Sequence, residues 1–504
     1  MHSSDKFRAV PVRRMSLRGA AGALGIAASI ASGCAVGPDF KRPPGPDTDA
    51  YTRNSLPDST AEADEKIQHF RMGSVVAPEW WRLFRSEPLD AYVMRAIAGN
   101  QTLQASEASL RRSRDNLLAG YGVFYPQIDV GLNASRQRSA PTLQGLQTPG
   151  SIFNLVTLTG NISYALDIFG GTRRAIEGLR AEVDNQGYAN KAAYVALTAN
   201  VVNAAIARAG YEAQIRSTEQ LIELQSQQLE SAAAQVRAGT APYSSLLSLR
   251  GLMAANQAAL APLKQRVSQT EHLLATLEGA VPSKSALPRI DLDSIQLPLD
   301  LPVSMPSDLV HQRPDILSAE AQLHTASANI GVATAAMFPS FSIGATYGVA
   351  GSSIGSLTSA AAKFWNFGPS LTLPVFRGGT LWYGRKAAIE SYRQSEAVYR
   401  ETVLAAFAQV ADCLTALQHD AEGLQAQVVA QRSASEALRL LQINYRAGLV
   451  AYLDVLAADV QLHQADVVYL QAVVQRHQDT VALFVALGGG WWNVPATPLP
   501  AASN

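Results

Sequence analysis

The chain has 504 residues, which is too long for one ordinary hydrophobic core, so several layers or domains are expected. Its 41 basic and 41 acidic residues cancel, which argues against a nucleic-acid-binding surface and against an acidic disordered tail. Charged residues make up only 16% of the chain and hydrophobic residues 47%, whereas about 25% charged residues are usual in soluble domains. We therefore expect much of the surface to lie against a membrane, a partner or copies of the same chain.

Residues 1–33 have the composition of a secretory signal peptide. Arginines precede a weakly apolar run at 19–30, and small residues lead up to Cys34. The run is too short and too rich in Gly and Ala to remain as a membrane span. The residues Ala31-Ser-Gly before Cys34 resemble a bacterial lipobox, with Ala31 where Leu is usual. This pattern predicts lipid attachment at Cys34; the alternative is an ordinary cleaved signal with an incidental cysteine.

Residues 34–85 follow the predicted cleavage site. They begin with the proline-rich stretch VGPDFKRPPGPD, which is typical of an extended tether. Ala35, rather than Asp, follows the cysteine, and this resembles lipoproteins that are sorted to the outer membrane.

The rest of the chain consists of two similar halves. Residues 100–131 align without gaps with residues 313–344, and the turn at 235–247 (QVRAGTAPYSSLL) recurs at 444–456 (NYRAGLVAYLDVL). Such a long spacing indicates duplication of a unit of roughly 200 residues rather than a short-period solenoid. The predicted division is a first repeat at 86–280, a proline-rich linker at 281–306, a second repeat at 307–490 and a tail at 491–504.

Each half contains a predicted β-hairpin, at 126–168 and at 339–376. Apolar and polar residues alternate strictly, as at Ile128, Val130 and Leu132, so each strand has one apolar face. The strands are about 10 residues long, which is enough to cross a bilayer at a tilt. Two half-buried hairpins of a soluble domain are the alternative interpretation. In lipid, four strands cannot close a barrel, so two or three copies would have to pool eight or twelve strands.

Each half is predicted to contain one helix ahead of its hairpin and two long helices after it. The segments 172–237 and 379–446 contain no proline, and helices of roughly 60 residues would extend about 90 Å. From Leu246 to Leu277, apolar residues follow alternating steps of three and four, which predicts a coiled-coil seam.

The sequence contains no convergent set of catalytic or metal-binding residues. The segment Gly351–Gly355 matches G-x-S-x-G, but it lies in a hairpin loop rather than in a strand-to-helix turn, so Ser353 is not expected to be a nucleophile. The histidines are scattered, and Cys413 is expected to be a buried free thiol. We therefore expect no enzyme, no cofactor and no metal site, and any transport must draw its energy from a partner.

Several motifs together resemble one known family. The segment CAVGPDFKRP at 34–43, the aromatic motif Trp80-Trp81-x-x-Phe84 and LGGGW at 487–491 accompany the duplication, the hairpins and the long helices. The chain thus resembles the TolC-like outer membrane factors, in their NodT-type efflux lipoprotein branch. The resemblance implies an α+β membrane protein, a homotrimer with a twelve-stranded outer-membrane β-barrel that is continuous with a long periplasmic α-helical barrel. It also implies a small mixed equatorial domain built from segments near 50–85, 280–305 and the C-terminus.

The same resemblance implies a function in transport. Such proteins are exit channels that passively conduct drugs or other small molecules, delivered by a periplasmic adaptor (membrane fusion) protein and an inner-membrane pump, usually of the RND type. They are anchored in the cell outer membrane by lipid, span it and extend into the periplasm. The alternatives are an exit duct for type I protein secretion and a structural coiled-coil lipoprotein.

Particular residues acquire expected roles from this family. The tip turns would contact the adaptor through Arg237 and Gly239 and through Arg446 and Gly448. From the residue types, the glycines suit a tight reversal with positive φ, and the arginines can bind the last helix carbonyls.

The second turn is expected to hold the pore gate, formed by Leu453, Tyr445 and Asp454. Relatives place an Arg and an Asp where this chain has Asn444 and Ala457, so their salt bridge is absent. Asp454 or Asp459 could supply a substitute carboxylate. We expect closure to depend more on the Leu453 side chain than on ion pairing.

Overall fold

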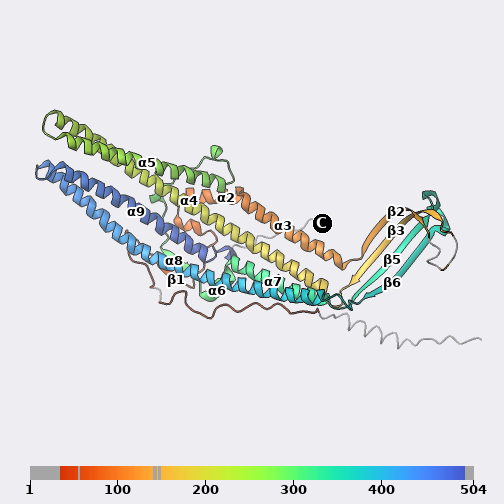
Figure 1. Ribbon diagram of the computed structural model, residues 1–504. Helices are drawn as coiled ribbons and strands as arrows, with labels where there is room; N and C mark the ends of the chain where they lie inside the picture. The colour runs from red at the N-terminus through yellow and green to blue at the C-terminus, as the bar shows by residue number, and fades with distance from the viewer. Residues whose placement is uncertain (1–34, 55–56, 140–144, 146–148, 494–504) are drawn as a thin grey trace, which may run out of the picture. The chain divides into compact units, whose positions relative to one another are not determined.

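The structure is a computed structural model that describes residues 35–54, 57–139, 145 and 149–493. The predicted signal peptide, the lipid-attachment residue Cys34 and most of the tail lie outside the described residues. The chain divides into two compact units, and Figure 1 labels most of their helices and strands. The first unit comprises residues up to Lys41, Ser113–Val183 and Gln322–Glu396, and the second comprises Arg42–Arg112, Asp184–Ala321 and the residues from Ala397 onward.

The first unit contains a four-stranded sheet. Its strands are β2 (Gln127–Arg138), β3 (Ile152–Leu166), β5 (Ser340–Gly351) and β6 (Lys363–Thr372), paired in the order β2-β3-β5-β6. Every pairing is antiparallel. The two hairpins of the sequence analysis therefore join along β3 and β5 into one sheet. Within the described chain, the outer sides of β2 and β6 have no strand partner.

The strand register places most of the apolar side chains of the four strands on one face. Ile128 pairs with Ile162, Ile162 with Ala345, and Ala345 with Phe367. Because side chains alternate between the faces of a strand, their polar neighbours share the opposite face, where Thr346 donates a hydrogen bond to Asn161 at 2.9 Å. The apolar face is uncovered, since Val130 is 77% and Trp365 75% exposed.

The longest elements of the described chain are four helices. Helices α4 (Gly171–Arg237) and α8 (Thr380–Arg446) have 67 residues each, and α5 (Tyr243–Leu277) and α9 (Tyr452–Ala486) have 35 each. A helix of 67 residues is about 100 Å long, slightly longer than the sequence indicated. One stretch of α4 is apolar enough to cross a bilayer by composition, but 61% of it is buried within the structure.

The seam of α5 faces the rest of the second unit. The seam positions are all buried or half-buried, whereas most intervening positions are exposed; they are Leu246, Leu249, Met253, Asn256, Leu260, Leu263, Val267, Thr270, Leu274 and Leu277. The helix continues through Pro262, although proline removes one helical hydrogen bond. Pro262 lies on the exposed side of α5, so packing along the seam is not interrupted.

Ahead of each hairpin, the sequence predicted one helix and the structure has two. These are α2 (Glu87–Gly99) and α3 (Gln101–Tyr121) in the first half, and α6 (Pro306–Gln312) and α7 (Pro314–Ala335) in the second. The breaks fall at Asn100 and Arg313, both of which have extended backbone. Asn100 caps α3 by accepting the Leu103 N–H at 2.9 Å, and Pro314 disfavours helical backbone at the residue before it.

A small parallel pair lies in the second unit. Strand β1 (His69–Met72) pairs with β4 (Asp300–Val303), which joins two segments that the resemblance assigned to the equatorial domain. Beside them lies a core of aromatic and aliphatic side chains that includes Trp80, Trp81, Phe84 and Phe484, all buried. The Trp80 and Phe484 rings stack at 5.4 Å. No pattern in the sequence predicted these two short strands.

The start of the described chain is extended but not free. In the first unit, the Val36 N–H donates to the Phe169 carbonyl at 3.1 Å. The buried Arg174 of α4 binds the Asp39 carboxylate at 2.7 Å, and the Phe40 ring stacks on His324 of α7 at 4.3 Å. Residues 35–41 are therefore extended and bind along α4 and α7.

Candidate functional site

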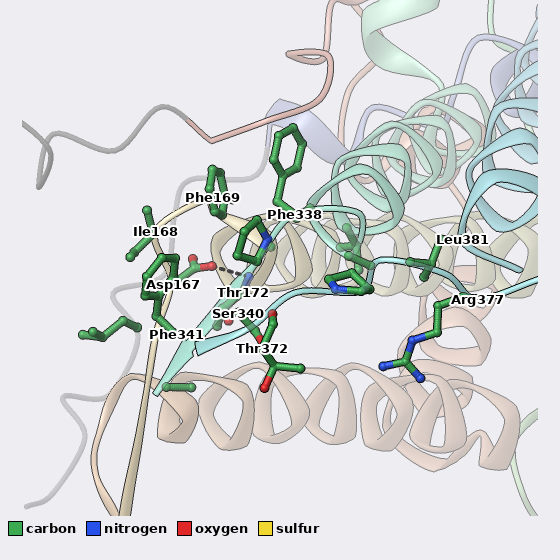
Figure 2. Close-up of a pocket in the computed structure, with 18 of the residues that line it drawn as sticks. Asp167, Ile168, Phe169, Thr172, Phe338, Ser340, Phe341, Thr372, Arg377 and Leu381 are labelled. Atoms are coloured by element: carbon green, nitrogen blue, oxygen red, sulfur yellow. Dashed lines mark hydrogen bonds between the residues drawn. The ribbon is translucent and has the colours of Figure 1, made fainter. Parts of the chain in front are cut away.

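A cavity of about 610 Å³ lies where strands give way to helices in the first unit. Figure 2 shows Asp167, Phe169 and Phe338 at one side of it and Arg377 at the other. The Asp167 carboxylate accepts the Thr172 N–H at 2.9 Å and the Arg173 N–H at 2.8 Å. It thus caps the start of α4, and the Phe169 and Phe338 rings stack at 4.7 Å beside it. The residues that line the cavity therefore stabilise the junction between the strands and the helices.

The candidate catalytic and redox groups have structural surroundings. Ser353 lies between β5 and β6, where its backbone N–H donates to the Ser356 hydroxyl at 3.0 Å. Cys413 is a buried free cysteine, and burial raises the pKa of its thiol to about 11. Within the described ranges, no group of three or more His, Cys, Asp or Glu residues could hold a metal ion.

Both tip turns end their helices in the same way. Gly239 has φ +72° and Gly448 has φ +73°, the left-handed region that glycine adopts without a Cβ penalty. The Thr240 N–H donates to the Gln235 carbonyl at 2.9 Å, and the Leu449 N–H donates to Asn444 at 2.9 Å. This is the Schellman arrangement of a helix C-terminus, formed after α4 and again after α8.

The arginines of the turns do not bind the helix carbonyls, contrary to the expectation from their positions. The Arg237 and Arg446 side chains are exposed and form no hydrogen bond or ion pair with the described part of the chain. Backbone N–H groups, including that of Gly239 to Val236 at 3.1 Å, satisfy the carbonyls instead. Both guanidinium groups are therefore free for an external partner.

The two tips pack against each other. Buried Ala232, Leu246 and Leu249 of the first hairpin contact Leu456 of α9, and Tyr452 packs on the same cluster. One chain thus joins the α4–α5 hairpin to the α8–α9 hairpin near their turns by apolar contact.

The three expected gate residues have different surroundings. Leu453 is 65% exposed. The Tyr445 ring packs on Tyr452 at 5.2 Å. The Asp454 carboxylate accepts the Ala451 N–H at 3.0 Å and so caps α9. Asp454 and Asp459 were the two candidates to replace the salt bridge found in relatives. The Asp454 carboxylate instead caps α9, and Asp459 is buried within the chain.

The family model for outer membrane efflux proteins matches this chain twice, at residues 93–280 and 305–489. The chain belongs to the outer membrane efflux protein family. The two matched segments contain the two hairpins and all four long helices.

Individual members of the outer membrane efflux protein family resemble the chain along almost its whole length. The antibiotic efflux pump outer membrane protein ArpC of Pseudomonas putida is 28% identical over 475 residues, covering 93% of this chain and 95% of ArpC. The cation efflux system protein CusC of Escherichia coli O6:H1 is 28% identical over 463 residues, covering 91% of this chain and 96% of CusC.

A solved structure of the outer-membrane channel OprN has the same fold. It superposes with a TM-score of 0.81 at 26% identity, covering 91% of this chain and all of that one. The superposition covers nearly the whole chain, so it includes the small sheet as well as the long helices.

Proposed function

We propose that the protein is the outer-membrane exit channel of a tripartite efflux system, which passively conducts small molecules. The observation that carries the proposal is the four-stranded sheet, with one uncovered apolar face and two edges that lack strand partners in the described chain. Lipid can cover such a face, but it cannot satisfy the backbone groups of an open strand edge.

Trimer formation would resolve the open edges. If β2 of one copy pairs with β6 of the next, three copies form a closed barrel of twelve strands. The polar face with Asn161 and Thr346 would then line the pore. A closed barrel leaves no edge in lipid, which supports this assembly over a single inserted chain. The barrel would continue into a periplasmic tube built from the long helices.

The internal duplication supports the same assembly. The family model matches two successive segments, and α4 and α8 have equal lengths, as do α5 and α9. We infer that each half supplies one strand hairpin and one helix hairpin. A trimer would then present six similar units around its axis.

The tips are the proposed docking and gating end. Arg237 and Arg446 are exposed without a partner in the described residues, beside the glycines of the two Schellman turns. We assign them to contact with a periplasmic adaptor, which would deliver substrate from an inner-membrane pump of the RND type. Leu453, exposed next to the tip cluster, is the proposed hydrophobic gate. Lipid on Cys34 would anchor the chain beside the barrel.

The names of the relatives suggest two classes of cargo. ArpC is named for antibiotics and CusC for cations. The described residues contain no cluster of metal ligands, and we favour drugs or other small organic molecules as cargo.

Drug susceptibility and conductance test the proposal together. A deletion strain should become more sensitive to several antibiotics and regain resistance with the wild-type gene. Purified protein should form heat-sensitive trimers with channel activity in planar bilayers. Normal susceptibility together with trimers that do not conduct would contradict the function.

A further inference from the structure

A buried polar cluster joins the two helix hairpins of the chain next to the apolar tip cluster. Its members are Gln225 of α4, Asn256 of α5, and Tyr452 and Asp459 of α9. Asn256 donates from Nδ2 to Gln225 Oε1 at 3.1 Å. Gln225 is fully buried, and Asp459 is only 5% exposed. Burial of a carboxyl group between helices requires either a partner or a proton.

Three polar atoms of this cluster lack hydrogen-bond partners within the described chain. They are Asp459 Oδ2, Gln225 Nε2 and the Tyr452 hydroxyl oxygen. Unsatisfied buried groups of this kind cost free energy, and an ionised carboxylate costs more than a neutral one. The packed arrangement therefore disfavours the charged form of Asp459.

Among the residues that the structure describes, no Lys or Arg side chain lowers the pKa of the Asp459 carboxyl group. From α4 it faces the neutral amide of Gln225, behind which lies Asn256 of α5. On its own helix it faces Tyr452, whose ring packs on Tyr445 of α8. Burial raises the pKa of Asp459, and the Gln225 amide offsets that increase only in part. Burial is also the largest cause of the raised pKa of Tyr452, which is about 12.

We propose that Asp459 is a proton-operated latch between the α4–α5 and α8–α9 hairpins. The protonated carboxyl group lets the hairpins pack together at the tip. Loss of the proton leaves a buried, uncompensated charge that favours their separation and the entry of water. Asp459 differs in this from the exposed Asp454, which caps its own helix.

The direction of the pH effect follows from the raised pKa. A carboxyl group whose pKa is higher in the packed state stabilises packing at low pH. That contribution is lost as the pH rises from the ordinary value of about 3.9 toward the raised value. We therefore expect the tip to be closed at acidic pH and to loosen at higher pH.

Space for this movement lies beside the latch. A cavity of about 880 Å³ between α4, α5 and α9 shares Asn256 with the polar cluster, and His463 and Pro262 also line it. On the far side of the cavity, Gly210 of α4 lies so close to Val474 of α9 that a Cβ at Gly210 would overlap its side chain. The two hairpins thus touch at two places, at Gly210 and at the tip, and the cavity lies between these contacts. The contact at the tip can therefore open while the contact at Gly210 remains.

Hydrogen–deuterium exchange of the purified full-length protein tests the latch directly. Protection factors, corrected for the intrinsic pH dependence of exchange, would be measured for peptides near 225–235 and 445–460 between pH 4 and pH 8. Each unit by which packing raises the pKa corresponds to a tenfold change in the packing equilibrium between the protonated and the ionised form, so wild-type protection should fall about fivefold or more from pH 4 to pH 8. Asp459→Asn should remain as protected at pH 8 as the wild type is at pH 4, within about twofold.

Two further variants make the result specific. Glu230→Gln removes an exposed carboxylate of α4 and should keep the wild-type pH dependence. Gln225→Leu removes the polar amide that lowers the Asp459 pKa and should move the midpoint of loosening to higher pH, which keeps the test decisive if Asp459→Asn does not fold. The latch is overturned if tip protection in the wild type does not change with pH, or if Asp459→Asn retains the wild-type change.

The effect of the latch on conductance rests on the proposed channel function, whereas the exchange measurement does not. Planar-bilayer recordings at the same pH values separate the two. Trimers whose tips loosen with pH but which never conduct would contradict the channel and leave the latch intact. Conducting trimers without pH-dependent protection at the tip would contradict the latch alone.

Discussion

The Asn100 amide nitrogen donates a hydrogen bond to the Leu277 carbonyl at 2.9 Å, joining the break between α2 and α3 to the end of α5. The second half repeats this relationship with different chemistry, because Arg313 donates to the Ala486 carbonyl at 2.7 Å. Each break in the helix ahead of a hairpin therefore satisfies a carbonyl at the end of the same half's last long helix.

Replacement of Asn100 by Ala should destabilise the second unit. The change removes the cap on Leu103 and leaves the Leu277 carbonyl without its donor, which together should cost about 1–3 kcal/mol. Urea unfolding of the purified protein would measure the loss. Asn100→Asp keeps the acceptor for Leu103 but not the donor, so its loss should be smaller. Equal stability of Asn100→Ala and wild type would contradict the assigned role.

Adjacent positions of β3 should respond oppositely to a charge. Leu158 pairs with Leu132 and Val349 on the apolar face, whereas Thr157 points to the polar face. An arginine facing the middle of a bilayer costs about 2–4 kcal/mol, so Leu158→Arg should reduce the yield of membrane-inserted, heat-sensitive trimer. Thr157→Arg is the matched control and should insert normally. The opposite result would place the polar face in lipid.

Shortening Leu453 should weaken the closed state. Its exposed side chain is the proposed hydrophobic barrier, and a smaller side chain leaves a wider and wetter constriction. Leu453→Ala should increase the closed-state current in planar bilayers several-fold. Leu449→Ala removes a similarly exposed leucine of the preceding turn and should change the current little. An unchanged current in Leu453→Ala would assign closure to other groups.

Asp420 of α8, which lies near Asp479 and Arg476 of α9, should make the stability of this helix pair depend on pH. Burial, with further contributions from the nearby Asp479, raises the pKa of Asp420 to about 7, despite the opposing charge of Arg476. A pKa raised by folding means that stability is highest below the ordinary value of about 3.9 and falls as the pH rises toward 7. Thermal unfolding from pH 4 to pH 8 should therefore show a falling melting temperature. Asp420→Asn should flatten that trend, and an equally steep trend in Asp420→Asn would refute the assignment.

Much of the fold and part of the site could be predicted from the sequence. Alternation such as Ile128, Val130 and Leu132 predicted strands, because the side-chain period of a strand depends only on local geometry. The seam from Leu246 to Leu277 predicted the packed face of α5 for the same reason. The positive φ of Gly239 and Gly448 was likewise expected from local turn chemistry.

Other features could not be predicted from the sequence because they depend on contacts between distant residues. Pro314 is a local signal for the break at Arg313, but no local pattern indicates that the breaks at Asn100 and Arg313 lie opposite the ends of α5 and α9. The parallel pairing of β1 with β4 joins segments more than 200 residues apart. The interpretation of Arg237 and Arg446 as helix caps was wrong, since backbone N–H groups had already satisfied those carbonyls.

The sequence by itself determined the duplicated order of hairpins and long helices, since periodicity and turn residues act over a few neighbouring positions. Only the tertiary structure decided that the four strands share a single apolar face with two open edges, because register is set by pairing between segments. Only the tertiary structure also showed that the two candidate carboxylates of the tip have different surroundings. Asp454 caps its own helix, whereas Asp459, five positions later, is buried against a helix from the other half of the chain, and burial is decided by what packs around a residue.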